Sequence, residues 1–532
     1  MYSYGMETSV AAGPDRGDRD GEDLQVLIIG AGFGGIAAAI ELRRRGVSDF
    51  LIVEKWDGPG GTWRANRYPG VAVDIPSLIY SLSYEQRSGW SRLFARGGEL
   101  LAYAEEVVDQ WDLRSRMRFD TEVVEMVFDE GTDQWRVSVD GPDGRREITA
   151  RFVINATGAL ERPRLPDIPG IDTFGGDVLH TARWDDSIRL DGRKVACIGT
   201  GASALQLIPE IAPLVAHLDV YQRTPIWVAP KFDPPFGPLI HGVLALPPLR
   251  GAIRAGGTIF FDVTANVVFQ QRLAPLRKLL EGSIRSWMCK QVDDPATAEA
   301  LIPDYGFGCK RPSMSNSYLR TFNRPNVALV TAPISAVTER GILTTDGDVH
   351  EADVLICATG FHVMSEEAPV PFPIRGRSGV ELGELWLKER FHSYQGVSVC
   401  GFPNLFSVMG PYGFVVGSYF WMIESTTKHA VRVITEAMKR GATSAEIRQG
   451  PQDRYVKKCR QRQKDSPLFG PSCATSNTYY VNFQGESPLR PSLYAEMWWE
   501  NRHFPLSHYR FGRSYATGEE SDRGRPSLVG ER

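Results

Sequence analysis

Two glycine-rich turns, each directly after an apolar strand, constrain this sequence more than any other feature. The first follows residues 26–29 and fits G-x-G-x-x-G through Gly30, Gly32 and Gly35. The second follows residues 195–198 and reads Gly199-Thr200-Gly201-Ala202-Ser203-Ala204. Small and apolar residues continue after both turns at helical spacing, which predicts two strand, turn and helix units that bind a dinucleotide pyrophosphate. The first glycine of each allows the tight turn, and the second lets the backbone approach phosphates at a helix N-terminus.

Residues of opposite charge follow the two turns at the same spacing. Glu54 stands at the tip of the strand at residues 50–53, where a carboxylate accepts hydrogen bonds from free ribose hydroxyls. Arg223, with Thr224 beside it, stands at the tip of the strand at residues 218–221. A guanidinium binds a 2′-phosphate in a bidentate fork, whereas a carboxylate repels it. The spacing therefore predicts FAD at the first turn and NADPH at the second.

The repeated unit predicts an α/β fold with two doubly wound, Rossmann-like dinucleotide-binding domains and a helical insertion in the second. Each turn has a matching downstream strand, which ends in Ala-Thr-Gly at residues 156–158 and 358–360. The expected boundaries are an FAD-binding domain at 24–165 and 361–512, an NADPH-binding domain at 166–230 and 303–360, and the insertion at 231–302. Residues 1–23 and 513–532 are predicted to be disordered tails.

The composition is typical of a soluble enzyme and argues against several other classes. The 532 residues carry a net charge of −4, and no strong basic stripe appears, so no nucleic-acid partner is expected. Prolines and charged residues interrupt the apolar stretch at 240–269, which predicts no transmembrane segment and a cytoplasmic location, while peripheral membrane contact stays open. The seven cysteines lack C-x-x-C spacing, so we expect reduced thiols and no metal site. The oligomeric state is left open.

A further motif lies between the two units. Residues 174–185 fit F-x-G-x-x-x-H-x-x-x-W-[PD] through Phe174, Gly176, His180 and Trp184. Here the chain resembles the type I Baeyer–Villiger monooxygenases, which are class B flavoprotein monooxygenases. Two other family motifs match Gly60-Gly61-x-Trp63 with Tyr68-Pro69-Gly70 and Asp74, and Cys309-Lys310-Arg311-Pro312. The resemblance extends from about residue 24 to 512.

The resemblance implies a reaction and its principal groups. NADPH reduces the flavin, and a ketone is then converted with dioxygen to an ester or lactone through a C4a-peroxyflavin. Arg311 matches the family's catalytic arginine, a fixed cation beside developing negative charge, and Asp74 matches the carboxylate that orients it. Lys310 matches a residue that approaches the 2′-phosphate together with Arg223 and Thr224.

The resemblance also implies positions near the flavin. These are Thr62, Trp63, Arg64, Ala65, Asp74, Tyr80 and Val123, although burial in the core would explain the aromatic residues equally well. The motif around His180 and Trp184 is expected to couple the two domains during turnover, a gating role that is favoured over an acid–base role. Where many family members read S-W-Y near the C-terminus, residues 472–480 of this chain do not, and Tyr479 or Tyr480 is expected to close the loop instead.

Two other function classes stay open on the sequence. A flavin-containing or N-hydroxylating monooxygenase acting on sulfur or nitrogen shares both turns but generally lacks the Trp184-Asp185 ending of the motif. An NADPH-dependent flavoprotein reductase is the other class, although a disulfide reductase would need a cysteine pair after the first strand, turn and helix unit, and none is there. A non-catalytic redox sensor would leave Asp74 and Arg311 without a role. Besides dioxygen, the expected small-molecule partner is a ketone, with a sulfide as a second possibility.

Overall fold

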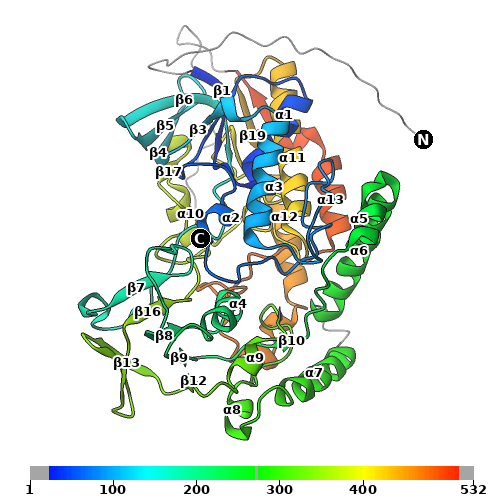
Figure 1. Cartoon of the computed structure of the whole chain (residues 1–532). Coiled ribbons are helices and arrows are strands. Elements are labelled where there is room, and N and C mark those ends of the chain that lie inside the picture. Colours follow the sequence, from blue (N-terminus) through cyan, green and yellow to red (C-terminus); the bar gives the residue numbers. More distant parts are fainter. Residues whose placement is uncertain (1–22, 270–273, 514–532) are drawn as a thin grey trace.

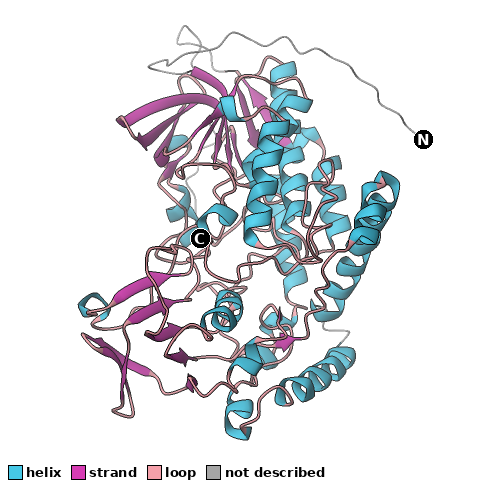
Figure 2. Cartoon of the chain, in the orientation of Figure 1, coloured by secondary structure: helices cyan, strands magenta, loops and turns pink. Residues whose placement is uncertain are grey.

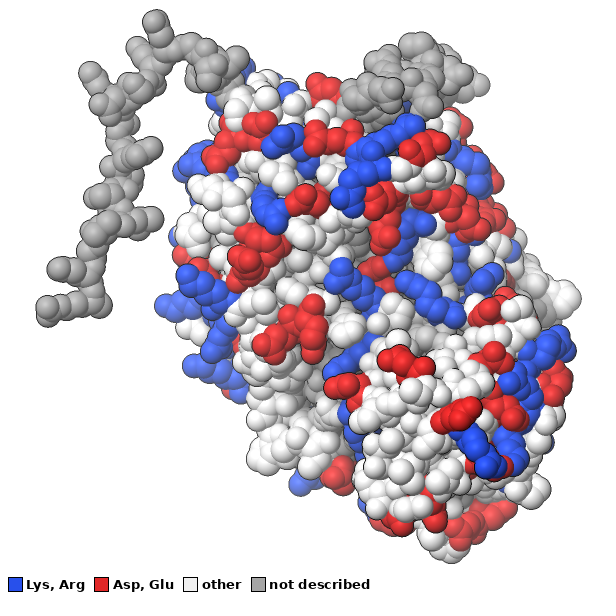
Figure 3. Space-filling model, turned by 90° about the vertical axis from the view of Figure 1, so that its left-hand side faces the viewer, with Lys and Arg blue, Asp and Glu red and all other residues white. Residues whose placement is uncertain are grey.

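The computed structural model describes residues 23–269 and 274–513. They form two lobes, each built on a sheet, with the strand β1 in the upper lobe of Figure 1 and β8 in the lower one. Helices cover the sheets of both lobes (Figure 2). Figure 3 shows Lys and Arg side chains interspersed with Asp and Glu over one face. Among the described residues, no helix is long and apolar enough to cross a membrane.

The upper lobe contains an eight-stranded sheet of order β17-β4-β5-β6-β1-β2-β3, with β18 paired to β6. Its strands are β1 (Asp23–Ile29), β2 (Phe50–Val53), β3 (Met117–Arg118), β4 (Glu122–Asp129), β5 (Gln134–Gly141), β6 (Gly144–Asn155), β17 (Ile374–Arg375) and β18 (Leu405–Ser407). β1 pairs in parallel with both β2 and β6, so that Ile28 lies between Ile52 and Ile154. All three isoleucines are buried, because helices or strands cover both faces of a central parallel strand.

Most helices of the upper lobe pack on one face of this sheet and complete the core there. They are α1 (Phe33–Arg44), α2 (Thr62–Ala65), α3 (Gly97–Gln110), α11 (Tyr419–Lys439), α12 (Gln449–Gln463) and α13 (Tyr494–His503). The opposite face is covered by α10 (Leu382–Glu389). The small strands β19 (Ser444–Ile447) and β20 (Tyr509–Gly512) pair antiparallel beside them. Strands β17 and β18 return the chain to the first sheet after residue 360.

The lower lobe contains a five-stranded parallel sheet of order β12-β9-β8-β16-β7. Its elements are β7 (Asp177–His180), β8 (Lys194–Ile198), α4 (Ala202–Ile211), β9 (His217–Tyr221), α9 (Tyr318–Thr321), β12 (Val327–Val330) and β16 (Val354–Cys357). Smaller sheets are formed by β10 (Val228–Ala229) with β11 (Ser313–Met314), and by β13 (Ile334–Thr338), β14 (Gly341–Thr344) and β15 (Val349–Glu351). The parallel order follows from the repeated strand, turn and helix unit.

The predicted insertion contacts both lobes. It contains α5 (Pro238–Ala245), α6 (Pro247–Phe269) and α7 (Ala274–Cys289), along the right of Figure 1, and α8 (Pro295–Ala300), at the bottom. Leu244 belongs to the core of the upper lobe, and the Arg254 guanidinium donates to Leu78 O at 2.8 Å. Met288 and Ala298 instead pack in the core of the lower lobe. These helices therefore bridge the lobes, and their assignment as an insertion within the second domain stays a prediction.

The predicted disordered tails lie outside the described residues, apart from one residue at each inner end. Asp23 is the first residue of β1, and the Arg513 guanidinium donates to Arg440 O at 3.1 Å. The expected domain boundaries otherwise stay predictions.

One expectation about the cysteines is wrong. Cys309 and Cys473 form a disulfide across 164 positions of the chain, whereas we expected every thiol to be reduced. Spacing rules detect cysteines that are near in sequence, and this pair meets only because the C-terminal segment packs on the lower lobe. The free cysteines are Cys197, Cys289, Cys357, Cys400 and Cys459. No cluster of His, Cys, Asp or Glu that could hold a metal occurs in the part of the chain that the structure describes.

Candidate active site

In the first glycine turn the backbone packs closely against its neighbours, as a dinucleotide-binding turn requires. Gly30 has φ +99°, and a Cβ there would lie 2.8 Å from Ala156 O. A Cβ on Gly35 would lie 1.9 Å from Gly30 O, so Gly35 allows α1 to pack against the turn. Gly32 precedes the first residue of α1, where unpaired amides point out of the helix. This geometry suits an anionic pyrophosphate.

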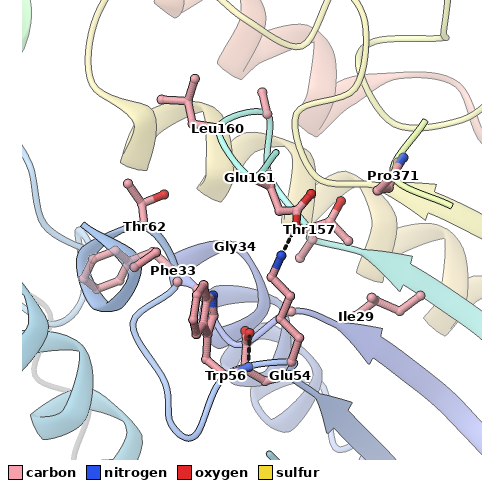
Figure 4. A pocket seen from close by; sticks show the side chains of 18 of the residues that line it. Ile29, Phe33, Gly34, Glu54, Trp56, Thr62, Thr157, Leu160, Glu161 and Pro371 are labelled. Atoms are coloured by element: carbon pink, nitrogen blue, oxygen red, sulfur yellow. Dashed lines mark hydrogen bonds and ion pairs between the residues drawn. The ribbon is translucent and has the colours of Figure 1, made fainter. Parts of the chain in front are cut away.

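Glu54 braces this turn from the tip of β2. Its Oε2 accepts a 2.6 Å hydrogen bond from the Ala31 amide, and its Oε1 accepts one of 3.1 Å from the Trp56 amide (Figure 4). The side chain is buried, and burial raises the pKa of Glu54 while the two amides oppose this. The predicted ribose-binding carboxylate is therefore also part of the turn.

A pocket opens between this turn and the beginning of the lower lobe. The predicted residues that line it are Gly30, Gly32, Glu54, Thr62, Trp63, Ala65, Tyr80 and Val123. Arg64 points elsewhere, because its guanidinium pairs with Asp57 at 2.9 Å and Glu105 at 2.7 Å. Tyr68 lies between the lobes and donates to Gln206 Oε1 at 3.0 Å.

Several lining residues escaped the sequence analysis. Lys55 and Trp56 directly follow Glu54, so their position at the strand tip was a usable signal. Lys55 forms an ion pair with Glu161, and the Arg183 guanidinium lies 4.7 Å from the centre of the Trp56 ring. Glu161 points toward the strand tip in Figure 4. Burial lowers the pKa of Lys55 and of Arg183. Two cations thus face this pocket.

The second glycine turn repeats the geometry of the first. Gly199 has φ +115°, and a Cβ there would lie 2.5 Å from Ala358 O. Gly201 immediately precedes α4, which begins with the predicted residues Ala202, Ser203 and Ala204. The Thr200 hydroxyl donates to Thr224 O at 3.0 Å and so ties the turn to the tip of β9.

Arg223 and Lys310 lie close enough in the structure for their charges to interact. Burial and the positive charge of Arg223 lower the pKa of Lys310 to about 8, and Asp304 only partly opposes them. The Lys310 ammonium also lies 5.3 Å from the centre of the Tyr305 ring. An anion placed between the two cations would relieve their repulsion, as a 2′-phosphate does.

Arg311 and Asp74 form the ion pair that the resemblance implied. Arg311 Nη2 donates to Asp74 Oδ1 at 2.7 Å, and the two side chains are 31% and 33% exposed. Burial acts to lower the pKa of Arg311, but Asp74 together with the nearby tyrosines opposes it, and the pKa is raised. Both Tyr80 and Tyr419 interact electrostatically with Arg311 and line the pocket, so the ion pair lies beside it.

The histidine motif begins at the edge strand β7 of the lower lobe. A Cβ on Gly176 would lie 2.3 Å from Asp353 O, and Phe174 and Trp184 pack in the cores of this lobe. His180 Nδ1 accepts from the Ala182 amide at 3.0 Å. Burial lowers the pKa of His180, so its ring is neutral near pH 7. The motif thus connects the lower sheet to the pocket, which Arg183 lines.

Comparison with known proteins identifies the family. The family described as pyridine nucleotide-disulphide oxidoreductase matches residues 24–245. A Baeyer–Villiger monooxygenase of Streptomyces coelicolor is 35% identical over 495 residues, covering 92% of this chain and 93% of the relative. One of Pseudomonas aeruginosa is 38% identical over 435 residues, covering 81% of each. This chain belongs to the Baeyer–Villiger monooxygenase family.

Solved structures of similar proteins agree with this assignment. OTEMO in complex with FAD and NADP has a TM-score of 0.82 and 28% identity, and the match covers 93% of this monooxygenase and all of that chain. A closed cyclohexanone monooxygenase has a TM-score of 0.82 and 29% identity with the same coverage. The predicted Rossmann-like α/β fold, the family, the two cofactors and the Baeyer–Villiger enzyme class are therefore confirmed.

Proposed function

We propose that the upper pocket of this Baeyer–Villiger monooxygenase holds FAD and that the second turn holds NADPH. Gly30, Gly32 and the amides at the start of α1 would receive the FAD pyrophosphate, with Glu54 at the ribose. A Cβ at Gly30 would lie 2.8 Å from Ala156 O, so only glycine permits the tight turn that leads to these amides, which supports this proposal. At the second turn, Arg223 and Lys310 would hold the 2′-phosphate.

The ion pair between Arg311 and Asp74 is the observation that most supports oxygenation at this pocket. When bound, FAD supplies hydride acceptance from NADPH and oxygen transfer from dioxygen to the substrate. Arg311 supplies a cation that cannot lose its proton, and it stabilises negative charge on the ketone oxygen when the carbonyl is attacked. Asp74 holds the guanidinium in place at 2.7 Å. A fixed charge avoids reorganisation during the reaction.

The proposed substrate is a ketone, which becomes an ester or lactone. One solved neighbour is a cyclohexanone monooxygenase with cyclohexanone bound, and another is a steroid monooxygenase bound to NADP. Their substrates differ in size, so the family alone does not select a ketone. Sulfide oxidation is proposed as a side activity. A cytoplasmic location stays a prediction.

A substrate panel under ¹⁸O₂ tests this function. Linear, cyclic, aryl and steroidal ketones and one aryl sulfide are incubated with the enzyme and NADPH, and product mass is compared with NADPH consumed. We expect one labelled oxygen atom in an ester or lactone. Sulfoxide without any ester would favour heteroatom oxygenation, and NADPH oxidation without labelled product would favour a reductase.

A further inference from the structure

We propose that the Cys309–Cys473 disulfide is a positioning element of the oxygenation site. It joins the segment that carries Lys310 and Arg311 to the C-terminal loop that carries Tyr479 and Tyr480. This inference rests on the proposed role of Arg311. In this proposal the disulfide, a covalent link, holds the C-terminal loop in place.

The disulfide lies where the two segments are already in close contact. The Cα atoms of Cys309 and Cys473 are 5.2 Å apart, and both side chains are buried in the core of the lower lobe. The Gly306 amide donates to Ser472 O at 2.8 Å. A Cβ on Gly306 would lie 3.2 Å from the Ser472 side chain, so the two backbones approach closely. The disulfide thus covalently joins two segments that are distant in sequence and already pack against each other.

The loop beyond Cys473 leads directly to the surroundings of Arg311. Ser476 is buried and its hydroxyl donates to Cys473 O at 2.7 Å, which continues the fixed path from the disulfide. The rings of Tyr479 and Tyr480 are 4.6 Å apart, and both tyrosines interact electrostatically with Arg311. Tyr479 is 56% exposed, so this part of the loop borders solvent. Fixing the loop therefore fixes the tyrosines that interact with the catalytic cation.

Reduction releases this constraint by a defined reaction. A dithiol transfers two electrons and two protons to the disulfide, which breaks the S–S bond and leaves two thiols and an oxidised dithiol. Residues 474–480 are then joined to residue 309 only by non-covalent contacts. Cys309 directly precedes Lys310, which would hold the 2′-phosphate, so binding would then have to order this segment, and we expect NADP⁺ affinity to fall about three- to tenfold. Water would also reach the site more easily, so hydrogen peroxide would form in place of product.

The test uses the FAD-loaded full-length enzyme in oxidised form and after dithiothreitol treatment and gel filtration. Four variants accompany it: Cys309→Ser, Cys473→Ser, the double variant, and Cys289→Ser as the matched control at a free cysteine. Alkylation with mass spectrometry identifies free thiols, and hydrogen exchange reports the order of residues 470–480. NADP⁺ affinity measures nucleotide binding, and the ratio of ester to hydrogen peroxide measures productive oxygen transfer at the site.

We expect reduction to expose Cys309 and Cys473 to alkylation, to speed exchange in the loop, and to lower both NADP⁺ affinity and the ester fraction. Each single variant should resemble reduced wild type, the double variant should no longer respond to dithiothreitol, and Cys289→Ser should behave as wild type. Free thiols at both positions in the oxidised enzyme would overturn the proposal. So would unchanged hydrogen exchange in residues 470–480 together with an unchanged ratio of ester to hydrogen peroxide after reduction. Failure to form ester in wild type would refute the proposed function separately, because thiol state and loop exchange do not depend on it.

Discussion

The Arg311 guanidinium donates a 2.7 Å hydrogen bond to Asp74 across 237 positions of the chain. Asp74 follows Gly60 and Gly61, which line the upper pocket, and Arg311 follows the lower-lobe residue Lys310, so the ion pair joins the two halves of the proposed site. The cation is correctly placed only when both lobes are folded against each other. The proposed oxygenation chemistry thus depends on an interaction between the lobes.

Replacing Arg311 should separate oxygenation from flavin reduction. Arg311→Ala should lose about 10²- to 10³-fold in ester formation, because a preorganised electrostatic donor is removed. Anaerobic bleaching of the flavin by NADPH should continue, since hydride transfer does not need this cation. Product analysis and anaerobic stopped-flow absorbance measure the two steps. The control is Arg340→Ala, at an exposed arginine that pairs with Glu351.

Asp74→Ala should cause a milder form of the same defect, because the charge of Arg311 remains but its orientation is lost. Ester formation by Arg311→Ala at the wild-type rate would refute the role assigned to Arg311. Heteroatom oxygenation would then be favoured over Baeyer–Villiger oxidation as the main activity.

Substitution at the first glycine should remove FAD. Gly30→Ala places a methyl group 2.8 Å from Ala156 O at a positive φ, so the turn must shift and close the pyrophosphate cradle. The purified variant should lack the yellow flavin absorbance. Gly98→Ala is the control, since a Cβ there meets nothing within 4 Å. Full flavin occupancy in Gly30→Ala would contradict the assignment of the first turn.

Removing Arg223 should reduce the preference for NADPH over NADH. Arg223→Ala should lose about 1.5–3 kcal/mol of binding to the 2′-phosphate, which is about 10- to 150-fold in KM for NADPH. The KM for NADH should change little, because NADH lacks that phosphate. Steady-state kinetics with both nucleotides decide this. Equal kcat/KM for NADPH and NADH in the wild type would contradict the argument from Arg223.

The KM for NADPH should rise as pH increases through 8. The pKa of Lys310 is lowered to about 8, and only its charged form attracts the 2′-phosphate. The attraction is therefore present below this pH and lost above it, which predicts about a tenfold weaker interaction at pH 9 than at pH 7. Lys310→Met should remove this dependence, and NADH should not show it. A flat KM profile for NADPH in the wild type would contradict the prediction.

Local sequence patterns were sufficient to predict both cofactor-binding units. A glycine turn, its strand and its helix lie within a short stretch, and backbone sterics at Gly30 and Gly199 determine the turn wherever the domain is placed. The positions of Glu54 and Arg223 at strand tips follow from the same local geometry. The sequence thus determined the two domain types and their cofactors.

The tertiary structure decided which distant residues meet. The ion pair of Lys55 with Glu161, the direction of Arg64 away from the pocket, and the bridging of both lobes by α5–α8 all depend on long-range packing. The same is true of the Cys309–Cys473 disulfide, since no rule of spacing connects residues that far apart. Such contacts form only when the lobes and the C-terminal segment pack together, because side-chain proximity there is set by the arrangement of whole elements and not by neighbours in the chain.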